Sequence, residues 1–249
     1  MPQFEFSARP PRSAGDLKVL DSPIWSALTN GHSHLALGNG LARRYPANIG
    51  PLSALSDQSD SAYSELRKLA EERPIVQFLA DTWQARSGWS LVREGMMDQM
   101  LWTEEVRVRQ ELSPTATLRE LTDEDSPAMV ALARLTEPGP FEPRTHTLGR
   151  FFGIFDSDTL VAMTGQRLHM PGFTEVSAVC THPSARGRGY SRVLIAQVMS
   201  DILNRKEHPM LHVFSANTSA IRVYRSLGFT LRRNLHLAVL KAEQGQSTS

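Results

Sequence analysis

Hydrophobic and polar positions in the second half of the chain switch between the strand pattern and the helix pattern. Residues 174–179 are rich in β-branched and small side chains, which is typical of a buried strand. Residues 193–203 repeat apolar side chains at the helical period and predict a helix with one apolar face. A short apolar run at 210–214 predicts another strand. A glycine-rich turn joins the first strand to the helix, so the local order is strand, turn, helix, strand.

The segment before this unit predicts a strand, a helix and a hairpin. Residues 117–121 form the predicted strand, and the acidic residues 123–125 cap a helix through Leu135, with carboxylates at its positive end. Prolines between residues 136 and 147 prevent that helix from continuing. Residues 151–155 and 160–166 then predict a hairpin that leads into the strand at 174–179.

The first half of the chain is less regular and predicts short elements separated by loops. Residues 1–20 are rich in Pro, Arg and Ser and predict a loosely held arm. The elements expected after it are a short helix opening at 21–25, two short strands within 34–46, a loop at 50–62, a helix at 64–72, a strand at 75–79 and a linker at 103–117.

Two segments of the first half resemble segments of the second. Residues 88–93 resemble 228–233, and residues 74–79 resemble 209–214, which indicates a worn internal copy. Only nine residues lead from Leu79 to Gly88, against fourteen from Phe214 to Gly228, so the first half has no room for the second half's closing segment. We therefore expect an arm (1–20), a non-catalytic domain (21–110) and a catalytic domain (115–242).

Composition limits the class of protein. The 249 residues are 41% hydrophobic and 21% charged, as in an ordinary soluble globular protein. Basic and acidic residues number 27 and 26, so nothing favours nucleic acid or an anionic membrane as a partner. Cys180 is the single cysteine, which excludes an intrachain disulfide and suits a reducing cytoplasm. We expect a cytoplasmic protein without a membrane span or a signal peptide.

The turn before the helix has the chemistry of an anion site. Gly187 and Gly189 allow positive φ, and the first amides of the helix have no partner within it, so the turn can hold a phosphate group. A dinucleotide fingerprint needs glycine where Arg192 stands, and the Gly-Lys-Ser/Thr ending of a P-loop is absent. A tight connection with solvated arginines remains the simpler alternative.

Two motifs together carry a family resemblance. Residues 186–191 read Arg-x-x-Gly-x-Ser, and residues 217–229 read Asn-x-x-Ala-x-x-x-Tyr-x-x-Leu-Gly-Phe. In this order they resemble the GNAT superfamily of N-acetyltransferases, although Ser191 stands where Gly or Ala is usual. The resemblance implies an α+β fold with a central, mostly antiparallel sheet flanked by helices, arranged here as two tandem GNAT-like domains.

The resemblance also implies roles for individual residues. The residues that it assigns to acetyl-CoA binding are Val179, Cys180, Thr181, Arg186, Gly187, Arg188, Gly189, Tyr190, Ser191, Arg192, Asn217 and Tyr224. Of these, Val179, Cys180 and Thr181 would act through their main chain, and Tyr224 would also protonate the leaving thiolate. Glu175, eleven residues before Arg186, matches a catalytic base of some members. A strand-end carboxylate in a surface ion pair is an equally good interpretation of Glu175.

The remaining candidate chemistry is weaker. No histidine or aspartate stands at a recognisable spacing from Cys180, so we expect a buried structural thiol rather than a nucleophile. His182 favours a structural role, and the eight histidines show no zinc-ligand spacing, so no metal is expected. We expect acetyl transfer from acetyl-CoA to a small-molecule or peptide amine. The alternative is a non-catalytic acyl-CoA-binding or sensing module, and a homodimer stays open.

Overall fold

The computed structural model describes residues 3–7, 16–109 and 111–243, and one eight-stranded sheet forms its centre. The strands are β1 (Gln3–Phe6), β2 (Ala42–Arg44), β3 (Ser53–Leu55), β4 (Ile75–Leu79), β5 (Trp89–Trp102), β6 (Val106–Arg109), β7 (Ala116–Leu121), β8 (Phe151–Asp156), β9 (Thr159–Met170), β10 (Phe173–Thr181), β11 (His208–Phe214) and β12 (Phe229–Ala242). The central sheet has the order β4-β12-β5-β11-β10-β9-β8-β7. Its neighbouring strands are antiparallel except β10 and β11, which are parallel.

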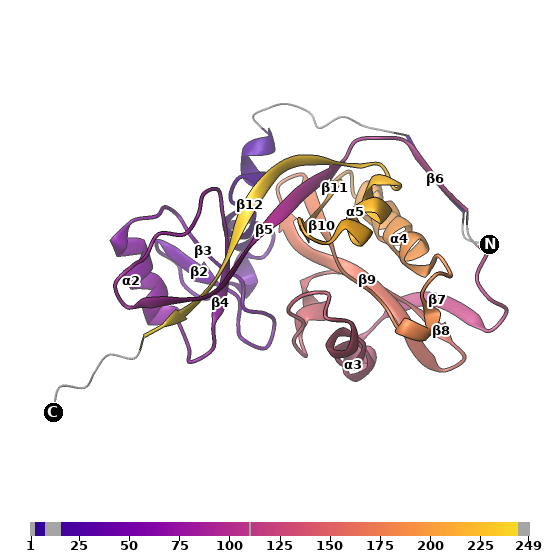
Figure 1. Ribbon diagram of the computed structural model, residues 1–249, viewed down its shortest axis with the longest axis horizontal. Coiled ribbons are helices and arrows are strands. Elements are labelled where there is room, and N and C mark those ends of the chain that lie inside the picture. The colour runs from indigo at the N-terminus through magenta and orange to yellow at the C-terminus, as the bar shows by residue number, and fades with distance from the viewer. Residues whose placement is uncertain (1–2, 8–15, 110, 244–249) are drawn as a thin grey trace.

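Helices cover both faces of this sheet. They are α1 (Pro23–Thr29), α2 (Asp60–Leu69), α3 (Ser126–Thr136), α4 (Tyr190–Asn204) and α5 (Thr218–Arg225). Successive residues of a strand point to opposite faces. On β8, Phe152 packs in the cluster that contains α4, and Phe151 packs in the cluster that contains α3 (Figure 1). The predicted mixed α/β fold with a mostly antiparallel sheet flanked by helices is confirmed.

Strand β5 belongs to the first half of the chain but lies inside the sheet of the second half. Phe229 of β12 lies opposite Trp102 of β5, and Ala242 lies opposite Trp89. On its other side, β5 pairs with β11 over residues 97–101. Figure 1 shows β5 and β12 running side by side between the two ends of the molecule. The predicted boundary between 21–110 and 115–242 therefore does not divide the sheet.

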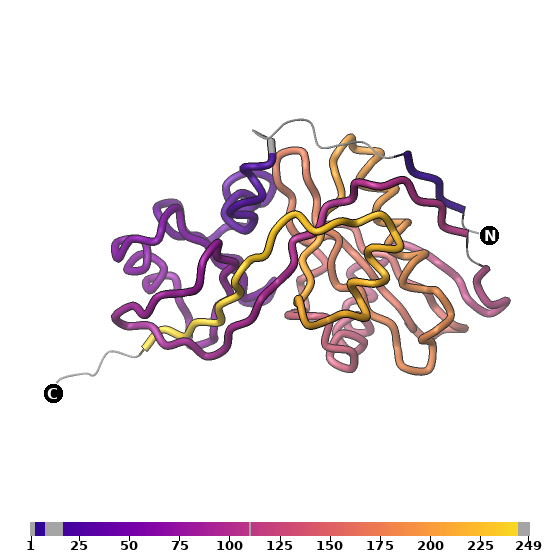
Figure 2. Tube along the Cα trace, turned by 45° about the horizontal axis from the view of Figure 1, so that its top comes forward, coloured from indigo at the N-terminus to yellow at the C-terminus, as the bar shows by residue number. Residues whose placement is uncertain are grey.

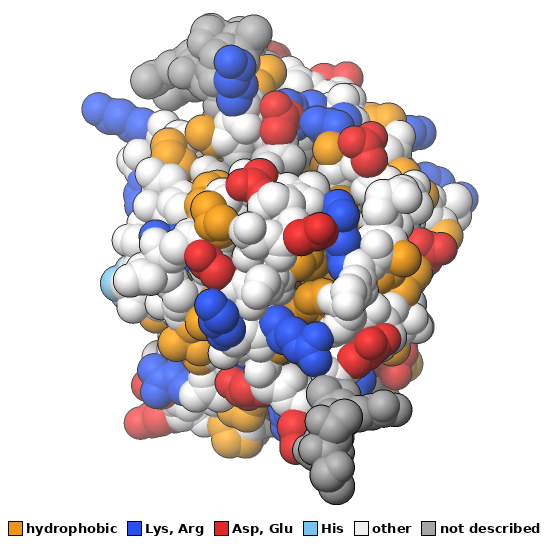
Figure 3. Space-filling model, turned by 90° about the vertical axis from the view of Figure 1, so that its left-hand side faces the viewer, with side chains coloured by type: hydrophobic (Ala, Val, Ile, Leu, Met, Phe, Trp, Pro, Cys, Tyr) orange, Lys and Arg blue, Asp and Glu red, His pale blue; other side chains and the backbone are white. Residues whose placement is uncertain are grey.

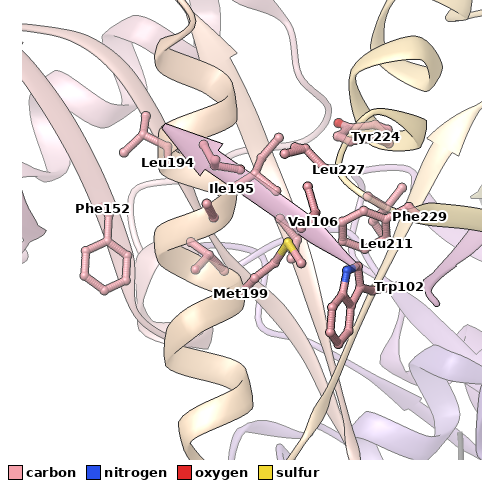
Figure 4. Close-up of a cluster of buried hydrophobic side chains, with 14 of the residues drawn as sticks. Trp102, Val106, Phe152, Leu194, Ile195, Met199, Leu211, Tyr224, Leu227 and Phe229 are labelled. Carbon is pink, nitrogen blue, oxygen red and sulfur yellow. The ribbon is translucent and has the colours of Figure 1, made fainter. Parts of the chain in front are cut away.

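The hydrophobic core is also shared. Trp102 and Val106 pack in one cluster with Leu194 and Met199 of α4 and with Phe229 of β12 (Figure 4). A second cluster likewise joins side chains from before residue 110 with side chains from β9 to β12. Separate cores are what independent domains require. The two halves share one sheet and these hydrophobic clusters, and the division into two tandem domains stays a prediction.

The two resembling segments occupy matching places in this sheet. Strand β4 lies outside β12, and β11 lies outside β5, so the pair β5–β12 has one resembling strand on each side. Gly88 and Gly228, which precede β5 and β12, both have positive φ, 77° and 81°. An origin of the first half as a copy of the second stays a prediction.

Several expectations for the first half are corrected. Residues 3–6 form β1, which pairs with β6 at 106–109, so neither the arm nor the linker is unstructured there (Figure 2). Residues 1–2 and 8–15 of the expected arm lie outside the described residues. The expected loop at 50–62 contains β3, which is the partner of β2. Helix α2 begins at Asp60, earlier than expected, because the Ser59 side chain accepts a hydrogen bond from the Ala62 amide.

Elements of the second half follow the expected order, because local signals mark their ends. Thr122 and Asp125 form a capping box before α3, and Glu137 ends that helix in the left-handed region just before Pro138. The side-chain oxygen of Asn217 accepts a hydrogen bond from the Ala220 amide and starts α5. These caps fix both ends of α3 and the start of α5.

Figure 3 views the end of the molecule that the first half forms. Acidic and basic side chains are interspersed over this face rather than separated by sign. Within the described residues, no helix is long and apolar enough to cross a membrane. The absence of nucleic-acid and membrane partners stays a prediction.

The shared sheet predicts that the second half does not fold alone. Without β5, strands β11 and β12 have no common neighbour, and the α4 cluster loses Trp102 and Val106. We expect a chain of residues 111–249 to show no cooperative thermal transition by circular dichroism. Co-expression with residues 1–110 should restore one. A cooperative transition of residues 111–249 alone would contradict the dependence on β5.

Candidate functional site

The turn before α4 presents a row of main-chain donors. Gly187 and Gly189 adopt φ of 78° and 73°, in the left-handed region that favours glycine. The amides of residues 187–191, all within the described chain, donate no hydrogen bond to another described residue, whereas those of Arg192 and Val193 bond to the Gly189 carbonyl. Five free amides at the positive end of a 15-residue helix form a concave site for an anion.

The arginines around this turn are placed differently from one another. Arg186 is exposed and lines a large cavity, with its Nε 3.4 Å from the Thr181 carbonyl. Arg188 pairs with Asp156 at 3.1 Å, and Arg192 bonds to the Ser226 hydroxyl. Arg186 is thus the arginine of this turn that both faces the cavity and lacks an ion pair within the described residues.

Tyr190 can contribute only its main chain to this site. Its side chain is buried and does not line the cavity, and its hydroxyl lies 3.1 Å from the Ser113 hydroxyl. Ser191 lines the cavity, where its small side chain leaves the amides of the turn accessible.

Strands β10 and β11 separate next to the turn. Their parallel pairing begins at Phe173–His208 and ends at Glu175–Met210, although both strands continue beyond it. On its other edge, β10 carries a bulge between Ser177 and Cys180, where Ala178 has a φ of 52°. Val179 has no register partner in either neighbouring strand within the described chain. Main-chain groups of residues 177–181 are thereby free to bind an extended ligand.

A cavity of about 960 Å³ occupies the gap between the separated strands. It brings together Val179, Cys180 and Thr181 of β10, Arg186 and Ser191 of the turn, and Asn217 and Tyr224 at α5. Seven of the predicted site residues therefore meet at one cavity. Because its oxygen caps α5, Asn217 has only its amide nitrogen left for a ligand.

Tyr224 is positioned to donate a proton. Burial and the nearby Glu175 raise the pKa of its hydroxyl to about 12, so the hydroxyl stays protonated at neutral pH. The hydroxyl has no hydrogen-bond partner among the described residues. Figure 4 shows the Tyr224 ring beside the apolar side chains of Leu227 and Phe229.

Glu175 is not placed as the predicted base. Its side chain is 0% exposed, does not line the cavity, and binds Arg167 through both oxygens at 2.6 and 2.8 Å. His212 donates from Nδ1 to the same carboxylate at 2.7 Å. Burial alone would raise the pKa of Glu175, but Arg167 and His212 outweigh it and hold the pKa at about 2. The alternative of a surface ion pair is wrong as well, because the pair is buried.

His212 is held by hydrogen bonds on both ring nitrogens. Its Nε2 lies 3.0 Å from the Gln99 side-chain nitrogen, which can only donate. Arg232 fixes the orientation of that amide by donating to its oxygen at 2.6 Å. Both ring nitrogens of His212 are therefore occupied by hydrogen bonds within the protein, and Nδ1 carries a proton toward Glu175.

The surroundings of Cys180 and His182 indicate structural roles for both side chains. Burial raises the pKa of the Cys180 thiol to about 12, so it carries almost no thiolate at neutral pH. His182 accepts a hydrogen bond from the Ser184 amide in the turn after β10. Within the described ranges 3–7, 16–109 and 111–243, no group of three His, Cys, Asp or Glu side chains is arranged to hold a metal ion.

The first half of the chain forms the other end of the cavity. Leu52, Val76, Phe78, Arg93 and Met97 line it there, together with Leu237 and Val239 of β12. The last turn of α3 and the residues up to Phe141 also line the cavity. The sequence did not reveal the lining residues of the first half, because their strands reach β10 and β11 through the pairing of β5 with β11 and β12. Arg167 was also missed, although the hairpin of β9 and β10 brings it beside Glu175.

The buried pair predicts a pH-dependent stability. The folded-state pKa of Glu175 is depressed from 4.5 to about 2. Its stabilisation is therefore complete above pH 4.5 and is lost as the pH falls toward 2. We expect Glu175→Gln to lower the free energy of unfolding by about 3 kcal/mol at pH 7, because Arg167 loses its partner. The difference from the unaltered protein should shrink by about 1 kcal/mol at pH 4.

Urea denaturation at the two pH values measures both effects. Glu5→Gln, which removes an exposed pair with Arg107, is the matched control and should change the free energy by no more than about 0.5 kcal/mol. A loss from Glu175→Gln as small as the control's would show that the buried pair does not stabilise the fold.

Comparison with known proteins places these features in a family. The family model described as FR47-like protein matches residues 151–237. A GNAT-family protein from Novosphingobium aromaticivorans is 34% identical, with a TM-score of 0.81 over 90% of this chain and 99% of that one. A comparison with curated proteins found no match.

Two more distant structures share the fold. A GCN5-related N-acetyltransferase from Kribbella flavida is 18% identical, with a TM-score of 0.59 over 92% of this chain and 97% of that one. A GCN5-related N-acetyltransferase-like protein from Streptococcus suis is 14% identical, with a TM-score of 0.56 over 88% and 92% of the two chains. Fold and family together support acyl transfer in general. With one-third identity over nine-tenths of its length to a GNAT-family protein, the chain belongs to the GNAT family of acetyltransferases.

Proposed function

We propose that this protein transfers an acetyl group from acetyl-CoA to a primary amine by direct attack in a ternary complex. The free amides of residues 187–191, which adjoin Arg186 and Ser191 on the lining of the cavity that Tyr224 also lines, carry this proposal. They fit the pyrophosphate of the co-substrate, because main-chain donors at a helix N-terminus favour a doubly charged anion. Arg186 supplies a further positive charge beside them.

The separated strands supply the place for the pantetheine arm. Main-chain groups at the β10 bulge, around Val179 and Cys180, lie between the turn and Tyr224 along the cavity wall. Amide donors at this bulge would stabilise the negative charge that develops on the acyl oxygen during attack. Acetyl-CoA supplies the acetyl group and a thiolate leaving group, and Tyr224 would give that sulfur a proton.

The acceptor amine must lose a proton without help from Glu175. Arginines and apolar side chains dominate the cavity lining. Positive charge and desolvation both favour the neutral form of an amine. An amine that enters the cavity therefore shifts toward its reactive form, and its proton can leave to solvent through the open rim before attack.

A second candidate function is a non-catalytic acyl-CoA-binding or sensing module. Ser191, at a position where the family usually has Gly or Ala, is the feature that favours it. The two functions differ in one measurement, because an enzyme releases free thiol from acetyl-CoA when an amine is added, whereas a module binds acetyl-CoA saturably without release. A cytoplasmic location, supported by the single buried cysteine, belongs to either proposal.

Removing the Tyr224 hydroxyl should slow the chemical step. We expect Tyr224→Phe to lower kcat by about 10²-fold, the usual contribution of a general acid. The Kd of acetyl-CoA should stay within about threefold, because the ring still fills its place. Tyr63→Phe, a buried tyrosine outside the cavity, is the matched control. An unchanged kcat for Tyr224→Phe would remove the proton-donor role.

The arginines of the turn should differ in their effect on binding. Arg186→Gln should weaken acetyl-CoA binding about five- to tenfold, since a charge-assisted contact at an exposed site contributes about 1 kcal/mol. Arg188→Gln should have a smaller effect, because Arg188 is already paired with Asp156. Isothermal titration calorimetry measures both. Equal losses of acetyl-CoA affinity in the two variants would mean that the anion binds elsewhere on the turn.

A further inference from the structure

The charged side chains that line the cavity are mostly positive. They are Arg93, Arg134, Arg167 and Arg186 against the single carboxylate of Glu137. Arg134 and Glu137 are both exposed on the rim, and Arg186 belongs to the turn before α4. Arg93 and Arg167 remain at the end formed with the first half, where no described carboxylate lines the cavity. This end therefore attracts anions and repels cations.

Arg167 is a fixed cation with one free edge. Its Nε and Nη2 donate to Glu175 at 2.8 and 2.6 Å, so the guanidinium plane cannot rotate. Its Nη1 makes no hydrogen bond with a described residue. This nitrogen is not fully buried, since the fully buried side-chain atoms without a hydrogen-bond partner do not include it. The Nη1 edge is therefore accessible from the cavity, while the compensating carboxylate lies behind it. A guanidinium held in this way can bind a carboxylate with little loss of side-chain freedom.

Arg93 supplies a second cation at this end of the cavity, on an exposed side chain. Its guanidinium carbon lies 5.3 Å from the centre of the Phe214 ring. It forms no ion pair or hydrogen bond with another described residue. The next residue, Glu94, bonds to His236 and does not line the cavity, so it does not neutralise Arg93 on the cavity side. Arg93 is thus free to close on an anion that Arg167 holds.

An apolar surface lies between these arginines. Val76 and Phe78 of β4 lie opposite Val239 and Leu237 of β12, and Arg93 of β5 lies opposite Val239. Directly paired residues share one face of a sheet. The guanidinium carbon of Arg167 lies 5.6 Å from the centre of the Phe78 ring. An acceptor that fits this end must therefore combine an apolar body with an anionic group.

We propose that the acceptor is a primary amine that carries a carboxylate and an apolar body, as an apolar amino acid does, with the carboxylate bound by Arg167 and Arg93. This inference rests on the proposed function and names the substrate class of the same cavity. Polyamines and aminoglycosides, whose charges are positive, are poor acceptors for this end of the cavity. The acetylated product keeps the carboxylate and loses its basic amine.

The test compares amines that differ only in the carboxylate. Full-length protein with acetyl-CoA is assayed for thiol release with phenylalanine, leucine, their carboxamides and spermidine. We expect kcat/KM for the amino acids to exceed that for the carboxamides at least tenfold, with spermidine lowest. A carboxamide has the less basic amine, so amine ionisation alone would favour the opposite order. Equal or higher kcat/KM for the carboxamides or for spermidine overturns the inference while leaving acetyl transfer intact.

Variants locate the anion site. Arg93→Gln should raise KM for the amino acids about tenfold and leave KM for the carboxamides within twofold, and Arg93→Lys should recover part of the loss. Arg109→Gln, an exposed arginine of β6 outside the cavity, is the matched control. Equal changes of KM for both classes of amine would mean that Arg93 does not bind the carboxylate, and would overturn the inference.

A binding measurement separates this inference from the proposed function. N-acetylphenylalanine and its carboxamide are titrated calorimetrically into the full chain with coenzyme A. Tighter binding of the acid, lost in Arg93→Gln, supports the carboxylate site even when no amine is turned over, and in that case the transferase proposal alone fails. Equal affinity of acid and carboxamide overturns the carboxylate site whatever the turnover.

Discussion

The site depends on a buried ion cluster at the point where two parallel strands separate. Glu175 is the last residue of β10 that pairs with β11, and its carboxylate is bound by Arg167 of β9 and His212 of β11. A buried carboxylate is tolerated only with such partners. Their hydrogen bonds hold three strands in register up to the separation. Beyond it, β10 and β11 diverge and the cavity opens.

The cluster of Glu175, Arg167 and His212 affects both ends of the cavity. Toward the turn before α4, the divergence leaves main-chain groups of the β10 bulge without partners, next to the free amides of residues 187–191. Toward the first half, Arg167 presents its remaining nitrogen to a pocket walled by Phe78 and Arg93. The same guanidinium that neutralises Glu175 therefore also lines the cavity at the end formed with the first half.

The first half of the chain lines one end of the cavity and supplies strand β5 to the middle of the sheet. Strand β5 pairs with β12 along its whole length and with β11 over residues 97–101. Because β5 lies between strands that follow it by more than a hundred residues, the sheet closes only when distant segments meet. Sharing β5 brings Arg93 and Met97 to the same cavity as Arg186 and Ser191 without a separate interface. The segment between β4 and β5 can differ from the corresponding segment between β11 and β12 without disturbing the turn before α4.

The sequence by itself determined the features that depend on neighbouring residues. The glycines at 187 and 189, the Asn217 cap and the apolar period of α4 act within a few residues, so the turn, the helices and the family resemblance were all predictable. Tertiary structure alone decided the surroundings of Glu175, the pairing of residues 3–6 with 106–109, the place of β5 and the cavity lining from the first half. Each of these is set by contacts between residues far apart in the chain. Side-chain burial and strand pairing have no local signal, because a carboxylate on a strand looks the same in sequence whether it meets water or an arginine.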